Sequence, residues 1–188
     1  MESECTVPSG KVLRVAVSGK SGCGNTTTST LLAKRLGVRL VNFTFRQLAA
    51  ERGMTLAQVI QSARGDDSYD LEVDRRQVAL ARETSCVLGS RLAIWMLPEA
   101  DLKVYLMADS ETRARRILQR DGGSLDDIRQ FTAMRDREDS LRYKKLYAID
   151  NNDFAFADMT VDSATHTPQQ IVELVVAELE KRHLVCKP

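Results

Sequence analysis

The feature that most constrains this chain is a glycine-rich loop between a short apolar run and a helical pattern. The loop reads Gly19-Lys-Ser-Gly-Cys-Gly24-Asn-Thr26. Residues 12–18 include the β-branched Val12, Val15 and Val17 and are predicted to form a buried strand, and residues 26–36 are predicted to form a helix. Glycines at this spacing let backbone N–H groups turn toward a phosphate, and the helix adds the positive end of its dipole. This context favours a phosphate-binding loop over a glycine-rich turn that binds nothing.

The loop residues are the first candidates for contact with a nucleotide. Thr26 occupies the position whose hydroxyl coordinates Mg²⁺ in loops of this kind. Asn25 stands where the standard loop has a lysine that neutralises the β- and γ-phosphates. We therefore expect Lys20, or an arginine further along, to supply the missing charge. The expected contact residues are Gly19, Lys20, Ser21, Gly22, Cys23, Gly24, Asn25, Thr26 and Thr27.

The rest of the chain alternates short apolar runs with helical patterns, which predicts an α/β fold with a five-stranded parallel sheet flanked by helices. Capping boxes are predicted at Thr55, Ser124 and Thr167, and Ser110 is predicted to cap a basic helix. The further strands are expected at residues 38–42, 86–88, 102–108 and 159–161. The further helices are expected at residues 45–52, Leu56–Ala63, 70–83, 110–120, 124–147 and from 167 onward.

Composition narrows the classes of partner. Lys and Arg number 27 against 26 Asp and Glu, so the net charge gives no case for nucleic acid or membrane. No apolar run approaches the roughly 20 residues of a membrane span. Residues 1–10 read as a short disordered lead and not as a secretory signal. The four cysteines lack metal-site spacing, and His166 and His183 lack partners at ligand spacing, so we expect reduced thiols, a cytoplasmic protein and no metal cluster.

Several motifs in order along the chain resemble the archaeal-type branch of the cytidylate kinases, within the P-loop nucleoside monophosphate kinases. The likeness covers residues 12–179, almost the whole chain. The motifs are Phe45-Arg46, Glu51-Arg-Gly-Met54, Asp70, Asp74-Arg-Arg-Gln77, Val87-Leu-Gly-Ser-Arg-Leu-Ala-Ile-Trp-Met96, Arg135-Asp-Arg-Glu138, Arg142-Tyr143, Tyr147-Ala-Ile-Asp150 and Asn152-Asp153.

The resemblance implies a single P-loop kinase domain over residues 1–188, with a helical acceptor-binding lobe at residues 55–83 and a lid at residues 111–147. It implies transfer of a phosphoryl group from ATP, with Mg²⁺, to CMP or dCMP. Arginine suits this chemistry because its planar fork binds two phosphate oxygens and stays charged. The expected catalytic residues are Lys20, Asn25, Arg91 and Arg135; the acceptor-binding residues are Arg46, Asp74, Arg75, Arg76 and Arg91; Arg113 is expected beside ATP.

Two positions depart from the pattern of that branch. Gly89 stands where an acidic residue would order Mg²⁺ through water, and Asn42-Phe-Thr44 differs from the usual loop after the second strand. Together with Asn25, these departures keep two other hypotheses open. One is a nucleotide-binding regulatory or partner-binding protein that has lost catalysis. The other is a P-loop kinase for a different small acceptor, such as shikimate. We expect a monomer whose partners are small-molecule nucleotides.

Overall fold

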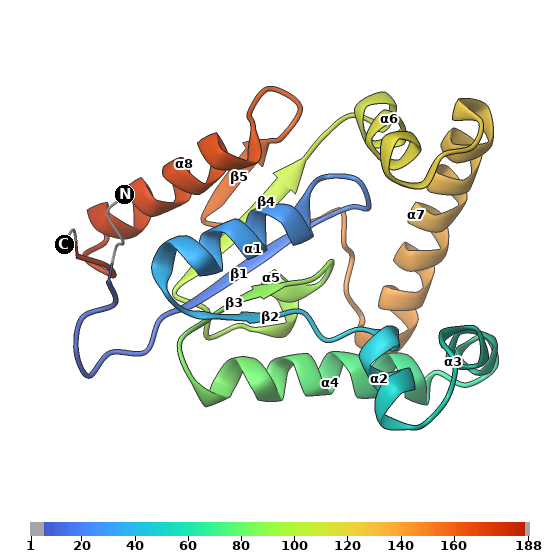
Figure 1. Cartoon of the computed structure of the whole chain (residues 1–188), viewed down its shortest axis with the longest axis horizontal. Helices are drawn as coiled ribbons and strands as arrows, with labels where there is room; N and C mark the ends of the chain where they lie inside the picture. Colours follow the sequence, from blue (N-terminus) through green and yellow to red (C-terminus); the bar gives the residue numbers. More distant parts are fainter. Residues whose placement is uncertain (1–5, 187–188) are drawn as a thin grey trace.

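The computed structural model describes residues 6–186, which form one parallel β-sheet with helices on both faces (Figure 1). All four strand pairs are parallel, and the strand order is β2-β3-β1-β4-β5. The five-stranded parallel sheet predicted from the sequence is thereby confirmed. The strands are β1 (Arg14–Gly19), β2 (Arg39–Val41), β3 (Cys86–Gly89), β4 (Leu102–Met107) and β5 (Met159–Asp162).

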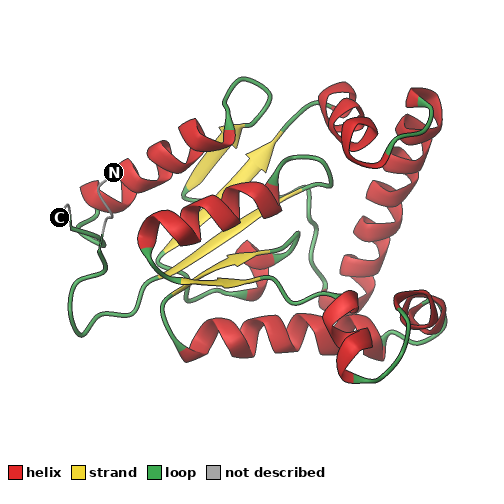
Figure 2. Ribbon diagram, viewed as in Figure 1, coloured by secondary structure: helices red, strands yellow, loops and turns green. Residues whose placement is uncertain are grey.

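Eight helices follow within the described residues, and Figure 2 shows them on both sides of the sheet. All except α5 were expected; α5 has four residues, too few for a helical period to be recognised. The helices are α1 (Asn25–Leu36), α2 (Phe45–Glu51), α3 (Leu56–Ala63), α4 (Ser68–Glu83), α5 (Ala93–Met96), α6 (Ser110–Asp121), α7 (Leu125–Tyr147) and α8 (Pro168–Lys181).

The alternation of side chains along β1 shows which helices cover each face of the sheet. Val15 and Val17 pack into a cluster with the apolar sides of α1 and α8. Ala16, between them, packs into a second cluster with α4 and α5 on the opposite face. Successive strand residues point to opposite faces, so a strand covered on both sides is apolar throughout. Trp95 packs at the edge of the second cluster, edge-on to Tyr105.

Two small helical units extend from one end of the sheet. Phe43, Leu48 and Val59 form the core of a unit built from α2, α3 and the start of α4. Ile117 and Ile128 belong to a separate core between α6 and α7. Figure 1 shows both units on the side to which the carboxyl ends of the strands point. Ligands of open α/β sheets bind at this edge, so the fold brings the units together around a common site.

Some helix boundaries differ from the expected ones. The N-cap of α6 is Asp109, whose side chain accepts a hydrogen bond from the Thr112 N–H, so the predicted cap Ser110 is wrong. Ser124 precedes α7 but makes no side-chain capping bond. The boxes at Thr55 and Thr167 are confirmed. A carboxylate accepts more strongly than a hydroxyl at a helix start, which explains the choice of Asp109.

The ends of the described chain meet. Thr6 and Cys186 exchange backbone hydrogen bonds of 3.1 and 2.9 Å as an isolated antiparallel bridge. The predicted disordered lead therefore does not extend to residue 6, and its first five residues lie outside the described part. Cys23, Cys86 and Cys186 are free thiols. Between residues 6 and 186, no helix combines the length and apolarity that a membrane crossing requires.

Candidate active site

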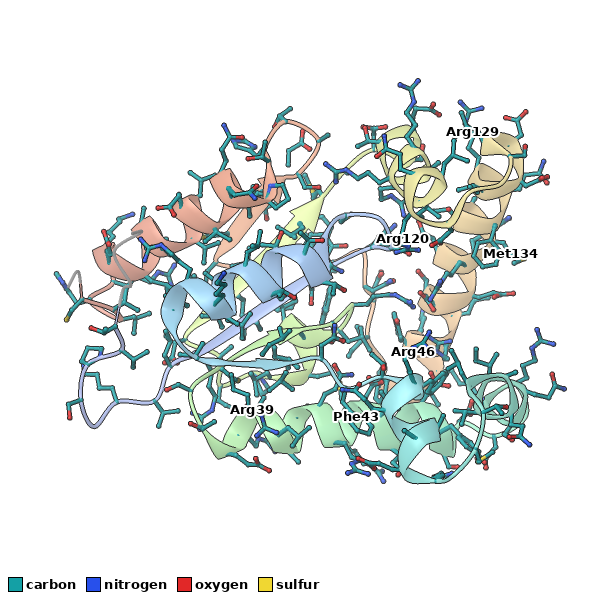
Figure 3. The ribbon with its side chains drawn as sticks, viewed as in Figure 1. Arg39, Phe43, Arg46, Arg120, Arg129 and Met134 are labelled. Carbon is teal, nitrogen blue, oxygen red and sulfur yellow. The ribbon has the colours of Figure 1, made fainter. Side chains whose placement is uncertain are left out.

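A cavity of about 1250 Å³ opens at the carboxyl end of the sheet. Its walls come from the segments that follow β1, β2, β3 and β5, and from one side each of α4, α6 and α7. Figure 3 shows Arg46 at the start of α2 and Arg120 on α6 on opposite sides of this opening. The cavity therefore joins the predicted phosphate loop to both helical units.

The loop after β1 has the shape of an anion cradle. Gly22 and Gly24 have φ angles of 85° and 94°, in the region where glycine avoids the strain of a side chain. A Cβ on Gly22 would stand 2.9 Å from the backbone oxygen of Arg113, so space also requires glycine there. The N–H groups at the first turn of α1 lack helical acceptors and face the cavity together with the exposed Thr26. The segment fits a phosphate group.

Asn25 uses its side chain within the loop. Its Nδ2 donates a hydrogen bond of 2.5 Å to the carbonyl oxygen of Gly19. The amide therefore closes the turn around the cradle and brings no charge to the cavity. A lysine at this position would carry its ammonium beyond the carbonyl, so the asparagine changes both the charge and the reach of the side chain.

Arg113 contacts the loop without lining the cavity. Its guanidinium donates to the carbonyl oxygen of Ser21 at 3.1 Å and pairs with both carboxylate oxygens of Asp136, the shorter contact being 2.7 Å. The side chain is 7% exposed and does not line the cavity. Arg113 was expected beside ATP, but the structure places its side chain outside the cavity. Because Asp136 lies on α7, Arg113 connects the loop to both helices of the predicted lid.

Arg116 makes the second connection between α6 and the loop. Its Nη1 lies 3.4 Å from the carbonyl oxygen of Gly22 and 3.0 Å from the Ser163 hydroxyl, and its Nη2 donates to the Ser163 carbonyl. Unlike Arg113, Arg116 lines the cavity. No role for Arg116 was predicted from the sequence; its spacing of three residues from Arg113 on one helix is the signal that both reach the loop.

Four Lys and Arg side chains line the cavity without a carboxylate partner among residues 6–186. Arg116 is held by Gly22 and Ser163, whereas Lys20, Arg46 and Arg135 have no side-chain hydrogen-bond partner in that range. Burial lowers the pKa of the Arg135 guanidinium, and the neighbouring charge of Arg91 lowers it further. Unpaired cations held close together favour a bound anion that relieves their repulsion. The structure thus brings these three predicted site residues, Lys20 in the loop and Arg46 and Arg135 outside it, to one cavity.

Arg91 and Arg142 share the buried carboxylate of Asp139. The Arg91 Nη1 lies 2.6 Å from one oxygen of Asp139, and the Arg142 Nη2 lies 2.8 Å from the other. Burial lowers the pKa of Arg91, but Asp139 and Tyr143 outweigh this effect and hold it above its ordinary value. Arg91 lines the cavity as predicted. Asp139 was not predicted; its signal is the i, i+3 and i, i+4 spacing with Arg142 and Arg135 along one helix face.

The acidic face of α4 forms the opposite wall. Asp70, Asp74 and Gln77 line the cavity, since they are three or four residues apart on one side of the helix. The Tyr147 hydroxyl donates to Asp74 at 2.6 Å, which links α7 to α4. Burial raises the pKa of Asp74, and the bond from Tyr147 lowers it in part. Sequence reasoning selected Asp74 but assigned no role to Tyr147.

Arg75 and Arg76 do not line the cavity, which corrects their expected contact with the acceptor. Arg76 pairs with Glu51 and lies over the ring of Phe43 at 4.7 Å. Arg75 is exposed on the far side of the helix. The motif Asp74-Arg-Arg-Gln77 spans a full helical turn, so its two outer residues share a face and its two inner ones cannot join them.

The cavity has few groups for a metal ion. Residues 6–186 hold no group of three or more His, Cys, Asp or Glu side chains able to bind a metal. Thr26 is the loop hydroxyl that lines the cavity at the predicted metal position. At Gly89, a Cβ would stand 2.4 Å from the Ser29 hydroxyl oxygen, so α1 fills the space that an acidic side chain would need. These residues fit Mg²⁺ that keeps most of its waters and bridges substrate phosphates.

Comparisons with known proteins agree with this site. Residues 14–165 match the model of the cytidylate kinase-like family. The chain belongs to the cytidylate kinase-like family. "Cytidylate kinase 2" of Borreliella burgdorferi is 40% identical over 92% of this chain and 98% of its own length. "Cytidylate kinase" of Pyrococcus abyssi is 39% identical over 89% and 94% respectively. The likeness to archaeal members of this family is therefore confirmed.

Solved structures establish the fold independently. A shikimate kinase from Bacteroides thetaiotaomicron superposes with a TM-score of 0.61 at 16% identity, over 90% of this chain and 99% of that one. The deoxyadenosine kinase of M. mycoides has a TM-score of 0.56 at 17% identity, over 89% and 100%. At such identities the likeness shows the fold alone. This member of the cytidylate kinase-like family is a phosphotransferase with the P-loop kinase fold, as its sequence predicted.

Proposed function

We propose that this chain transfers the γ-phosphoryl group of ATP to CMP or dCMP and releases ADP with CDP or dCDP. The observation that carries the proposal is the arrangement of one cavity. The phosphate loop, the polar face of α4 and the unpaired cations Lys20, Arg46 and Arg135 all line this one cavity. Transfer between two bound nucleotides needs such a site, with phosphates facing each other and charge dispersed around them.

The donor phosphates would occupy the cradle after β1. The N–H groups at the start of α1 would bind the β-phosphate, and Lys20 would take the place of the standard lysine. A bound Mg²⁺ would supply positive charge that stabilises the donor phosphates. Thr26 is the side chain that would hold the ion. Asn25 would act by fixing the turn through Gly19, since its amide is bound there.

The acceptor would occupy the lobe of residues 55–83. Arg46 and Arg91 would hold its phosphate, since both line the cavity beyond the loop. Cytosine presents an N4 amine, which a carboxylate accepts, and O2 and N3, to which an amide can donate. Asp74 and Gln77 offer both kinds of group in adjacent positions. Arg135 would stabilise the charge that spreads over the γ-phosphoryl group during transfer.

A second candidate is a nucleotide-binding protein with weak catalysis. The observation in its favour is that Asn25 is uncharged and engaged with Gly19, while Gly89 has no room for an acid. Placed charges dominate phosphoryl transfer, so two such changes would lower turnover. The unpaired cations of the cavity favour the kinase.

A coupled ADP-release assay tests the proposal. The full chain would be assayed with ATP and Mg²⁺ against CMP, dCMP, UMP, AMP, GMP and shikimate in parallel. We expect turnover with CMP and dCMP that exceeds turnover with each other acceptor at least tenfold in kcat/KM. Turnover with another acceptor alone would replace the proposed substrate. ATP binding without turnover toward any acceptor would establish the nucleotide-binding alternative.

A further inference from the structure

The cavity extends past the phosphate loop into a slot between α6 and the segment that joins β5 to α8. Ile117 and Arg120 line this slot from α6, and Ser163, His166 and Pro168 line it from the other side. No role for His166 follows from the sequence. A slot with aliphatic walls and a cation suits a flat heteroaromatic ring, which packs on apolar carbons and stacks on a guanidinium plane.

The hydrogen bonds of His166 fix its tautomer. Nδ1 lies 2.9 Å from the backbone carbonyl oxygen of Asp162, and a carbonyl can only accept. Nδ1 therefore carries the proton. The Thr165 hydroxyl also donates to that carbonyl, and its oxygen lies 3.0 Å from Nδ1, where it can accept a share of the same proton. A neutral imidazole protonated at Nδ1 presents a lone pair at Nε2.

The other ring nitrogen of His166, Nε2, is available to accept a hydrogen bond from a ligand. It has no hydrogen-bond partner among residues 6–186, and the ring lines the slot. An acceptor in this position selects for a base with an N–H group opposite it. Adenine has an exocyclic N6 amine that donates, whereas guanine has at the same position an oxygen that accepts. Two acceptors facing each other repel, and one of them loses its hydrogen bond to water.

We propose that His166 determines the base of the phosphoryl donor, with Nε2 accepting a hydrogen bond from the exocyclic amine of adenine. This inference rests on the proposed function only in taking the α6 side of the cavity for the donor and the α4 side for the acceptor. His166 touches no phosphate in this arrangement, so it acts on donor binding and not on the transfer step. Thr165 and Asp162 are positioning residues, because they hold the ring in the required tautomer.

A double-mutant cycle between protein and ligand tests the proposal. The protein change is His166→Asn, whose amide can still donate to the Asp162 carbonyl but has no group at the position of Nε2. The ligand change is ATP to purine riboside triphosphate, which lacks only the 6-amino group. Equilibrium dissociation constants with Mg²⁺ would be measured by calorimetry for both proteins and both ligands. His183→Asn is the matched control, because His183 is exposed and lies outside the cavity.

The wild-type protein and the His183→Asn variant should bind ATP about tenfold more tightly than purine riboside triphosphate, as expected for one hydrogen bond to the partly buried His166. In the His166→Asn variant the two ligands should bind within about twofold of each other. A ratio of affinities within one variant is insensitive to the fraction of folded protein. An unchanged tenfold preference in His166→Asn would overturn the proposal, and so would the absence of a preference in the wild type.

Failure of the two proposals can be told apart. The cycle measures binding and needs no acceptor, whereas the proposed function is tested by turnover of CMP. Coupling between His166 and the amine without CMP turnover would support this inference and reject the kinase. Turnover of CMP without coupling would support the kinase and reject the role of His166.

Discussion

Asp139, near the middle of α7, accepts a 2.6 Å hydrogen bond from Arg91, which follows β3. Its carboxylate is 8% exposed, and its other oxygen is bound to Arg142. The pair ties the lid helix to the carboxyl edge of the sheet at the place where the acceptor phosphate is proposed to bind. Arg91 therefore has a structural role in addition to its proposed contact with substrate.

Asp139→Asn tests that structural role. The amide keeps the shape of the side chain but loses the charge that separates Arg91 from Arg142, so two cations would face each other without compensation. We expect the free energy of unfolding to fall by about 2 kcal/mol, measured by urea denaturation at pH 7. Asp121→Asn removes a carboxylate from an exposed pair with Arg120 and should change stability by less than about 0.5 kcal/mol. Equal effects of the two substitutions would contradict a structural role for Asp139.

The fold could be predicted from the sequence because it depends on patterns that any residue of the right class satisfies. Val15 and Val17 are β-branched residues beside a glycine loop, and this is enough to predict a buried strand and its place in a parallel sheet. The alternation of strands and helices then leaves few topologies. The pattern did not predict α5, because its four residues form little more than one helical turn and show no repeat.

The site could be predicted only in part, because a motif identifies residues but does not show which of them lie on the side of the helix that faces the cavity. Of the three residues expected at the acceptor, Asp74 lines the cavity, whereas Arg75 and Arg76 do not. An arginine's role also depends on which carboxylates reach it. Arg113 is held by Asp136, 23 residues away, while Arg135 has no such partner among the described residues. Sequence distance does not reveal such pairs.

Arg135 and Arg113 form a matched pair for separating catalysis from structure. Arg135→Met removes an unpaired cation from the cavity, so kcat for CMP phosphorylation should fall about 100-fold while the unfolding temperature changes little. Arg113→Met leaves Asp136 without a partner and the Ser21 carbonyl without a donor, so the free energy of unfolding should fall by about 3 kcal/mol. Thermal denaturation and the ADP-release assay on both variants measure the two effects. A loss of stability in Arg135→Met similar to that in Arg113→Met would refute the distinction.

The ionisation of Asp74 should make the free energy of unfolding depend on pH. Burial raises the pKa of Asp74, so the folded state favours the neutral carboxyl group. The stability that this group contributes is fully present below its unfolded pKa of about 4 and is lost as pH rises through the folded pKa. Urea denaturation between pH 4 and 7 should therefore show wild type losing stability relative to Asp74→Asn as pH increases. No trend, or the opposite trend, would show that burial does not govern Asp74.

Two further variants sharpen the pH experiment. Tyr147→Phe removes the hydrogen bond that lowers the pKa of Asp74, so the loss of stability with rising pH should become larger.

The contribution of Asp109 to stability should change with pH in the opposite direction to that of Asp74, because hydrogen bonds from Thr112 hold the pKa of Asp109 below its ordinary value. Its contribution is present above the unfolded pKa and is lost as pH falls through the folded pKa. Relative to Asp109→Asn, wild type should therefore lose stability below about pH 4.

Gly89 stands where α1 leaves no room for a side chain on β3. A Cβ at Gly89 would lie 2.4 Å from the Oγ of Ser29 and 2.7 Å from its Cβ, so α1 or β3 would have to move. Gly89→Ala should therefore lower the free energy of unfolding by about 2 kcal/mol. Gly65→Ala is the control, since no atom lies within 4 Å of its added Cβ, and it should change stability by less than about 0.5 kcal/mol.

Ser29→Gly removes both atoms that the new methyl group would meet. In that background, Gly89→Ala should cost less than about 0.5 kcal/mol, although Ser29→Gly itself weakens α1 by up to about 1 kcal/mol. Urea denaturation of the four proteins gives the interaction energy directly. If Gly89→Ala were equally costly with and without Ser29, the contact with α1 would not be its cause. If the cost disappears, the Ser29 side chain is what excludes a side chain at position 89.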